Sequence, residues 1–333
     1  MNWSCTLRLA LGVILVASSG FTEKKEEEGK ALVDRAKQLS DIRAEGAPAF
    51  QLKTSFKVIK EDSTATEGTY TETWVSRSQW RTETVLGDFR EIVVGNGNKR
   101  WALMSTSAVP KGTEELGFRM ASLRFSPEYW RPEKIEDRKI QSVAVRCIMP
   151  KPGPTGGKSS LCFDKGAGTL AVEVLPLEVL GRIVDNTCEY TDYQKFGEKV
   201  FPRVTRCFEG PRLTFEEILV ELSVEPPLDP ALFEPLVGGT ESVLCQGVPK
   251  SPTPVYTPMP APPRNVYLEY PVILQVIIET DGKAHDLRVV QSVDEAFDNA
   301  AMEAVRRWRF RPATCDSEPI ATQIRVKIDF RMF

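Results

Sequence analysis

This sequence has very little histidine, no surplus of positive charge and no paired cysteines of the kind that bind metals. The single histidine, His285, excludes any site that needs two imidazole rings. Lys and Arg number 43 against 46 Asp and Glu, so the basic excess typical of nucleic-acid-binding proteins is missing. No CxxC motif occurs, which argues against a redox or zinc site. We therefore predict no catalytic residue, no metal, no cofactor and no nucleic-acid partner. A hydrolase that uses carboxylates alone is the enzymatic alternative.

The N-terminus also lacks an apolar run long enough to cross a bilayer. Residues 9–17 are apolar, follow Arg8 and precede small residues at 18–20. A spanning helix needs about 20 apolar residues. We therefore interpret residues 1–20 as a signal peptide and expect a periplasmic location. An uncleaved N-terminal membrane anchor is the alternative.

Cysteine is present in a number that suits an exported chain. Of seven cysteines, Cys5 would leave with the signal peptide, so six would remain and could form disulfides. Gly197-Glu198 suits a two-residue type II′ turn, and counting outward from it places Cys188 opposite Cys207. Another pair flanks the turn-rich residues 150–157. Six free buried thiols are the alternative to the predicted disulfides, which are Cys147–Cys162, Cys188–Cys207 and Cys245–Cys315.

Residues 50–222 alternate apolar and polar side chains with the period of two that is typical of β-strands. About ten strands with short turns imply one large, curved antiparallel sheet. An amphipathic helix is expected over residues 23–45, with Leu32, Ala36, Leu39 and Ile42 on its apolar face. The expected strands are 50–58, 70–74, 79–84, 89–94, 100–104, 140–148, 160–163, 169–174, 182–193, 199–207 and 214–224.

Proline is concentrated between this region and the C-terminus. Residues 249–263 are so rich in proline that an extended, semi-rigid spacer is expected. An SH3-type ligand is the functional alternative to a spacer. The predicted organisation is a signal peptide at 1–20, a β domain at 21–236, a proline-rich linker at 237–264 and a C-terminal domain at 265–333.

The last domain has the clearest local pattern. Alternating apolar residues predict strands at 272–278 and 285–291, with a tight turn at Asp281-Gly282. Ser292 and Glu295 have the spacing of a capping box and predict the start of a helix that Pro312 ends. A last alternating strand follows. The order is β-β-α-β, in which the helix covers one face of the sheet.

This C-terminal region resembles the TonB C-terminal domain family. The resemblance implies a domain that binds a short extended peptide of an outer-membrane transporter by strand addition to its last strand. Arg325, Lys327 and Arg331 would favour an acidic partner and discourage self-association. The alternative is that these charges only protect an edge that nothing uses. The residues that carry the resemblance are Glu279–Gly282, Val289–Ser292, Asp298–Ala301, Ala304–Pro312 and Val326–Phe330. The implied docking residues are Gln323, Ile324, Arg325, Val326, Lys327, Ile328 and Asp329.

The chain departs from this family in features that matter for energy transduction. Family transducers carry a longer membrane helix with a histidine that couples to a proton-driven motor, and the apolar segment here has none. Tyr270-Pro271 and Ser317 also replace usual glycines. Coupling to a motor is therefore doubtful, whereas peptide docking is still expected.

The β domain resembles LolA-type lipoprotein carriers more weakly. The resemblance rests on the early helix, the Tyr70–Arg81 hairpin, the stretch Leu161–Leu170 and the end Leu228–Phe233. It implies a half-barrel whose apolar concave face holds acyl chains. Packing of the same aromatic side chains in an ordinary core is the alternative. The candidate cleft residues are Phe50, Phe56, Tyr70, Trp74, Trp80 and Trp101.

Together these patterns predict an α+β protein, with a large curved antiparallel half-barrel and packed helix followed by a small TonB-like domain. The expected function is non-enzymatic docking of an envelope protein or transporter peptide in transmembrane transport. The alternative is a periplasmic carrier whose partner is a lipid or lipoprotein.

Overall fold

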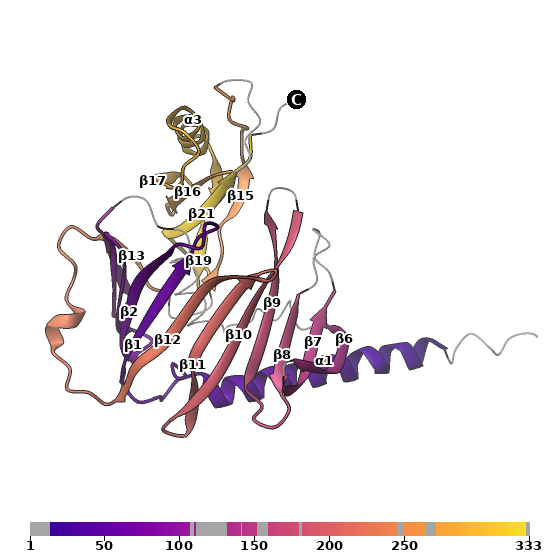
Figure 1. Ribbon diagram of the computed structural model, residues 1–333. Helices are drawn as coiled ribbons and strands as arrows, with labels where there is room; N and C mark the ends of the chain where they lie inside the picture. Colours follow the sequence, from indigo (N-terminus) through magenta and orange to yellow (C-terminus); the bar gives the residue numbers. More distant parts are fainter. Residues whose placement is uncertain are drawn as a thin grey trace, which may run out of the picture. The chain divides into compact units, whose positions relative to one another are not determined.

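The computed structural model describes residues 14–106, 110, 132–140, 142–151, 159–179, 182–245, 249–263 and 271–330. Residues 1–13 of the predicted signal peptide and Cys5 lie outside this part. The chain forms two compact units that interleave in sequence (Figure 1). The first comprises Met1–Asp41 and Ala121–Leu213, and the second comprises Ile42–Met120 and Thr214–Phe333. The domain boundaries drawn from the sequence stay predictions.

The described residues are mostly β-structure, with two α-helices and a large antiparallel sheet that does not close on itself. This composition agrees with the α+β class expected from the sequence.

The first unit consists of one long helix and six consecutive antiparallel strands. The strands lie in the order β11-β10-β9-β8-β7-β6, so that each pairs with its neighbour in sequence. The elements are α1 (Ile14–Ser40), β6 (Pro132–Ile140), β7 (Val143–Pro150), β8 (Ser160–Asp164), β9 (Leu170–Val179), β10 (Arg182–Phe196) and β11 (Lys199–Glu209).

Helix α1 packs on these strands through its smallest side chains. Its buried stripe is Gly29, Val33, Ala36 and Ser40, at helical spacing. Of the expected apolar residues, Ala36 and Ile42 are buried and Leu32 and Leu39 are half-buried, and the helix ends at Ser40 rather than near residue 45. Because small residues line the stripe, the helix backbone can approach the sheet closely.

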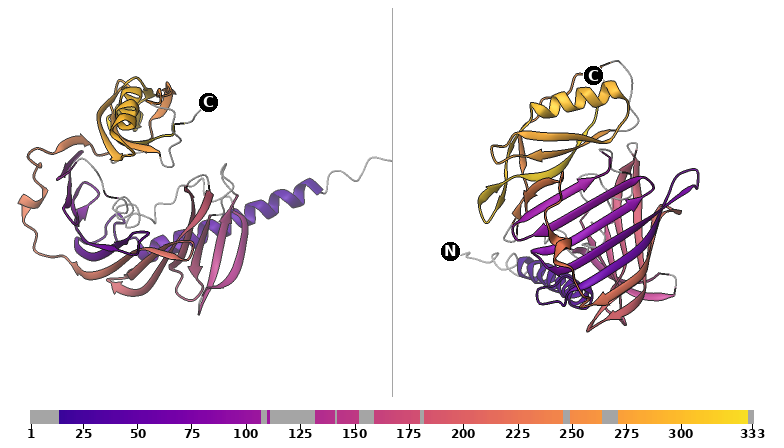
Figure 2. Two further views of the ribbon diagram at one scale, coloured as in Figure 1. Left: turned by 45° about the horizontal axis from the view of Figure 1, so that its top comes forward. Right: turned by 90° about the vertical axis from the view of Figure 1, so that its left-hand side faces the viewer.

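Contacts at two places fix the direction of α1 across the strands. Lys25 Nζ donates to the carbonyl of Glu133 on β6 at 3.1 Å. Lys199 Nζ on β11 donates to the carbonyl of Gln38 at 3.0 Å. The helix therefore crosses this sheet from one end of the strand order to the other (Figure 2).

Two disulfides join directly opposed residues of this unit. Cys188 pairs with Cys207 in the register that the Gly197-Glu198 turn predicts, and their Cα atoms are 4.1 Å apart. Gly197 has the positive φ of 57° that the first residue of a type II′ turn requires. Cys147 and Cys162 are likewise paired across β7 and β8, with a Cα–Cα distance of 4.0 Å. Both bonds match the sequence prediction.

The second unit contains a seven-stranded part of the antiparallel sheet and the C-terminal elements. The first part has the order β13-β5-β4-β3-β2-β1-β12. Its strands are β1 (Phe50–Ile59), β2 (Ala65–Ser76), β3 (Gln79–Leu86), β4 (Phe89–Asn96), β5 (Lys99–Met104), β12 (Arg212–Val224) and β13 (Thr240–Val243), with the 3₁₀ turn η2 (Pro230–Phe233) between the last two.

The C-terminal elements form three small sheets and one helix. The sheet orders are β17-β16-β21, β14-β19-β20 and β15-β18. The elements are β14 (Pro249–Lys250), β15 (Thr253–Tyr256), β16 (Val272–Ile278), β17 (Ala284–Gln291), α3 (Glu295–Arg306), β18 (Arg309–Arg311), β19 (Ala313–Cys315), β20 (Glu318–Ile320) and β21 (Thr322–Ile328).

Two strands of the large sheet were not predicted, and both are end strands in the strand order. Strand β6 precedes the strand that we expected to begin at residue 140, and six of its nine residues are charged. Strand β13 lies in the segment predicted as linker and pairs with β5. Charged residues protect a sheet edge from further pairing, so an edge strand loses the apolar alternation by which it could be recognised.

A close approach of side chain to backbone occurs at Gly68 on β2. The ring of Phe56 on the neighbouring strand lies over this glycine, so a Cβ atom there would be 2.3 Å from Phe56 Cζ. It would also be 2.5 Å from the carbonyl oxygen of Val85. The backbone oxygen cannot move aside as a side chain can, so only glycine fits without a shift of the sheet.

We expect Gly68→Ala to lower the free energy of unfolding by about 1–3 kcal/mol, because overpacking displaces Phe56 and the β3 backbone. Urea denaturation followed by tryptophan fluorescence measures the change. Gly29→Ala is the control, because a Cβ atom on this helical glycine would make only ordinary contacts, the nearest at 3.5 Å from Pro132. Equal stability of Gly68→Ala and the unmodified protein would contradict the packing described here.

Candidate functional site in the C-terminal sheet

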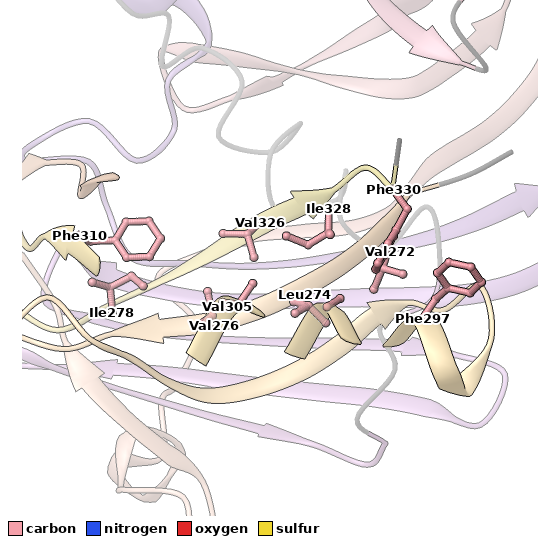
Figure 3. Packing of buried hydrophobic residues seen from close by; sticks show 11 residues of the cluster. Val272, Leu274, Val276, Ile278, Phe297, Val305, Phe310, Val326, Ile328 and Phe330 are labelled. Carbon is pink, nitrogen blue, oxygen red and sulfur yellow. The ribbon is translucent and has the colours of Figure 1, made fainter. Parts of the chain in front are cut away.

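The core of the C-terminal domain is built from alternate residues of β16 and β21 that face α3. Val272, Leu274, Val276 and Ile278 are fully buried, and Val326 and Ile328 lie beside them. Helix α3 contributes Phe297, Ala301 and Val305. Figure 3 shows these side chains converging between the helix and the strands. The rings of Phe297 and Phe330 meet edge to face, with centroids 4.9 Å apart.

This packing positions β21 as an edge strand of its sheet. β21 pairs with β16 in antiparallel register, with Leu274 opposite Val326 and Gln275 opposite Arg325. In the strand order β17-β16-β21, no further strand of the described residues follows β21. Its second backbone edge is therefore not occupied by another strand of the sheet, and edge strands can accept an incoming chain.

The predicted docking residues divide between two faces of β21. Ile324, Val326 and Ile328 pack toward the α3 core. Gln323, Arg325, Lys327 and Asp329 alternate with them, and the last three are exposed. Lys327 Nζ lies 3.4 Å from the Asp329 carboxylate, so its positive charge is partly balanced within the strand. The exposed face of β21 that an incoming peptide would meet therefore carries both positive and negative charges.

The start of α3 differs from the capping box that the sequence predicts. Asp294 is the N-cap, and its Oδ1 accepts hydrogen bonds from the backbone N–H groups of Ala296 and Phe297 at 3.0 and 3.1 Å. Ser292 Oγ instead contacts Asp298 Oδ2 at 2.5 Å. Aspartate in the extended conformation is as good an N-cap as serine, so spacing alone could not decide between them.

The Asp281-Gly282 hairpin is joined to the chain after α3. The N–H of Phe310 donates to the carbonyl of Gly282 at 2.9 Å. Gly282 has a φ of 79°, and a Cβ atom there would be 2.0 Å from the Phe310 carbonyl oxygen. The glycine therefore serves the turn and also this close contact, which the sequence does not reveal.

The proline-rich segment is paired with the chain that follows α3. Pro249 lies opposite Cys315, Thr253 opposite Arg311 and Tyr256 opposite Arg309. The indole N–H of Trp308 donates to the carbonyl of Pro258 at 3.1 Å. Cys245 and Cys315 form the third predicted disulfide, with Cα atoms 5.6 Å apart. Extended structure was expected in this segment, whereas its pairing with residues 309–315 was not.

The aromatic residues proposed to line a cleft lie on both faces of the β1–β5 sheet. Phe50, Trp74 and Trp80 lie directly opposite one another on three neighbouring strands and therefore share one face of the sheet. Phe56 and Tyr70 lie on this same face, because each is an even number of positions from Phe50 or Trp74 along its strand. Trp101 is on the opposite face, where it packs with Ile92, Val94 and Leu236. Five of the six are buried, and Trp80 is half-buried. Phe50 stacks on Trp74, and Phe56 stacks on Phe215.

Two buried carboxylates share that aromatic face. Glu72 accepts hydrogen bonds from Tyr70 Oη at 3.0 Å and from Arg43 Nε at 2.6 Å. Glu217 accepts from Thr54 Oγ1 at 2.7 Å. Burial raises the pKa of the Tyr70 phenol well above its ordinary value, and the nearby Glu72 charge raises it further. Because the protein's own side chains already bind both carboxylates, the cluster has the character of a buried structural network.

Within the described ranges, no cluster of three or more histidine, cysteine or acidic side chains has the arrangement of a metal site. The same part of the chain contains no helix with the length and apolarity needed to span a membrane.

Fold and site together define a mostly β protein with a large open sheet and a small C-terminal domain that ends in an edge strand. Residues 267–332 match the family model described as Gram-negative bacterial TonB protein C-terminal. This match confirms the resemblance inferred from the C-terminal motifs. It covers only the last part of the chain. A comparison with curated protein sequences finds no match.

Solved structures with a similar course of the chain come from several bacteria. A domain from Vibrio parahaemolyticus, described as an outer membrane lipoprotein-sorting protein, is 13% identical with a TM-score of 0.43, over 62% of this chain and 97% of that one. A LolA superfamily protein from Nitrosomonas europaea is 10% identical with a TM-score of 0.41, over 62% and 97%. A DUF1329 family protein from Desulfovibrio piger is 9% identical with a TM-score of 0.42, over 63% and 97%. At TM-scores below 0.5 these likenesses carry no conclusion about function.

Tyr70 and Tyr193 should ionise later than ordinary tyrosines. Burial raises the pKa of both phenols. A group whose pKa is raised on folding contributes stability that is complete below its unfolded pKa, near 10, and is lost as the pH rises beyond it. An absorbance titration at 295 nm should therefore show Tyr70 and Tyr193 among the tyrosines that ionise only as the protein unfolds.

Tyr70→Phe is the matched test of that assignment. It keeps the ring and removes the phenol, so the number of late-ionising tyrosines should fall by one. If Tyr70→Phe left the late fraction unchanged, Tyr70 would not be buried beside Glu72 in solution.

Proposed function

We propose that this chain is an exported, non-enzymatic binding protein of the bacterial envelope that docks an extended segment of a partner by strand addition to β21. The partner is an envelope protein or an outer-membrane transporter peptide, and the process is transport across the envelope. The observation that carries the proposal is the position of β21 at the end of the strand order β17-β16-β21.

Strand addition needs a backbone edge that keeps its shape before the partner arrives. The α3 core holds one face of β21 through Val326 and Ile328. Pairing with β16 over residues 322–328 occupies one of its backbone edges. An incoming strand would therefore meet a rigid, preformed template, which lowers the entropy lost on binding.

The proposed organisation gives each region a separate role. Residues 1–20 would direct export to the periplasm, and residues 21–236 would form a LolA-like half-barrel. Residues 237–264 would connect it to the docking domain at 265–333. The family match at residues 267–332 supports the role of the last region.

Proline substitutions in β21 test the docking edge directly. Consecutive backbone N–H groups of a strand point to opposite edges, so either Val326 or Lys327 directs its N–H away from β16. Of Val326→Pro and Lys327→Pro, the one that removes the outward N–H should fold and bind its partner roughly three- to tenfold more weakly, the effect of one lost hydrogen bond.

The partner would first be captured from envelope extract and then reduced to a synthetic peptide. Fluorescence anisotropy measures the affinity, and far-ultraviolet circular dichroism checks folding. Lys327→Ala is the control, because it removes the side chain but keeps the N–H. Amide chemical shifts of the unmodified protein identify which of the two N–H groups points away from β16. If the folded proline variant at that position bound its partner with unchanged affinity, docking on β21 would lose its support.

A second function is carriage of an acyl chain on the aromatic face of the β1–β5 sheet. The observation that favours it is that five of the six predicted aromatic residues share this face. A fluorescent fatty acid should then bind and be quenched by Trp80, the one member of the set that is not buried. Trp80→Ala is the comparison, because it should remove the quenching. If the unmodified protein showed no saturable binding, the carrier function would be dismissed.

A further inference from the structure

A cluster of basic residues lies in the C-terminal domain, on elements other than β21. Residues 249–263 and 304–315, which pair with each other, contain no acidic residue at all. The chain as a whole has a net charge of −3, so this concentration is a local departure from its average. The five basic residues are Lys250, Arg306, Arg307, Arg309 and Arg311.

The pairing of β15 with β18 orients part of this charge outward beside an aromatic ring. Phe310 is buried, so its neighbours Arg309 and Arg311 face the other way and are exposed. Tyr256 lies directly opposite Arg309, and Thr253 lies directly opposite Arg311. Directly opposed residues share one face of a sheet. The arrangement therefore places two guanidinium groups and a tyrosine ring on a single exposed face.

Exposed apolar side chains also lie near this face in the proline-rich segment. Val255 is 68% exposed, Tyr256 is 59% exposed and Met259 is 56% exposed. Large apolar groups are seldom left in solvent next to one another without a binding role. A register shift between Pro254 and Tyr256 lets Thr253 and Tyr256 both lie opposite arginines, so we call the face formed by Thr253, Tyr256, Arg309 and Arg311 the basic-aromatic face.

The charges of this face are only partly balanced within the chain, since Lys283 and, to a smaller extent, Arg309 lower the pKa of the Asp281 carboxyl, which forms its ion pair with Lys283. None of the ion pairs within the described part of the chain involves the five basic residues. Arg309 Nη1 donates only to the backbone carbonyls of Arg306 and Trp308, at 3.2 and 2.7 Å. Neither Arg309 nor Arg311 is engaged in an ion pair with a carboxylate of the described residues, so both guanidinium groups can bind one from outside.

We propose that the basic-aromatic face binds an extended acidic peptide segment of a partner protein. Arg309 and Arg311 are two residues apart on one strand, which separates their Cα atoms by about 6.6–6.8 Å. Carboxylates at every second position of an extended peptide have the same spacing. An acidic side chain could therefore meet each arginine in turn, while a neighbouring residue of the peptide contacts Tyr256.

Three constraints hold the face in place before a partner binds. The Cys245–Cys315 disulfide, the Trp308–Pro258 hydrogen bond and the β15–β18 pairing fix the proline-rich segment to residues 309–315. A preformed surface loses little entropy on binding. The inference does not depend on strand addition at β21, because it uses the side chains of other strands.

The test uses two fluorescein-labelled peptides of identical composition and the full-length, disulfide-bonded protein. In one peptide three glutamates occupy every second position, and in the other they occupy every third position. Anisotropy at low ionic strength measures both affinities. We expect the first peptide to bind at least about tenfold more tightly, because only its carboxylates match the arginine spacing.

Variants then assign the binding to this face. Arg309→Glu with Arg311→Glu should weaken the first peptide at least about tenfold. Tyr256→Ala should weaken binding of the first peptide about threefold. Because the Tyr256 ring is exposed, this substitution disturbs the fold less than a change in the core would. The charge-matched control is Lys139→Glu with Lys151→Glu, two exposed lysines of the first unit, which should change the affinity less than about twofold.

The outcomes separate this inference from the proposed function. Proline in β21 should leave binding of the acidic peptide unchanged, even if it abolishes capture of the β21 partner. Equal affinity for both peptides, or equal effects of the two double variants, would overturn the inference in favour of unspecific charge attraction. Binding to vesicles of anionic phospholipid without binding to either peptide would also overturn it, and would assign the face to a membrane surface.

Discussion

The packing of α3 on alternate residues of β16 and β21 is the interaction on which the C-terminal domain depends. Because Leu274 and Val326 are directly opposed and both face the helix, one layer of apolar side chains sets the register of the two strands. A slip by one residue would turn Arg325 or Lys327 toward the helix and the apolar set toward solvent. The same packing holds β21 beside β16 at the end of the strand order β17-β16-β21, so the core also positions the candidate docking edge.

Covalent bonds add a second constraint that spacing and packing alone would not supply. The Cys245–Cys315 disulfide closes a loop that reaches from the chain after β13 to β19, with a sequence separation of 70 residues. It keeps the proline-rich segment beside residues 309–315, where β14 and β15 find their partners. A segment with so many prolines could not form a sheet by itself, because proline lacks the backbone donor. Its order comes from the domain that it joins.

Sequence reasoning succeeded where one local signal specified one local structure. Most of the strands from β1 to β12 follow from period two, and the Cys188–Cys207 pair follows from the turn at Gly197. It failed at β6 and β13, which are edge strands with charged or mixed residues, and predicted the buried stripe of α1 only in part. The buried stripe Gly29, Val33, Ala36 and Ser40 shares Ala36 with the expected face, whereas Leu32 and Leu39 are half-buried beside it. It also placed Trp101 with aromatic residues that the register puts on the other face.

What the sequence alone determined about this protein is the set of elements whose signals are short-range. These are the alternation of the strands, the turn glycines, the cysteine pairs and the helix-end motif of the TonB-like region. Only the tertiary structure decided that β13 pairs with β5 and that Tyr256 lies beside Arg309. The physical reason is that an edge, a face and a long-range pair are properties of neighbours in space. No periodicity within one segment can encode which distant segment will lie beside it.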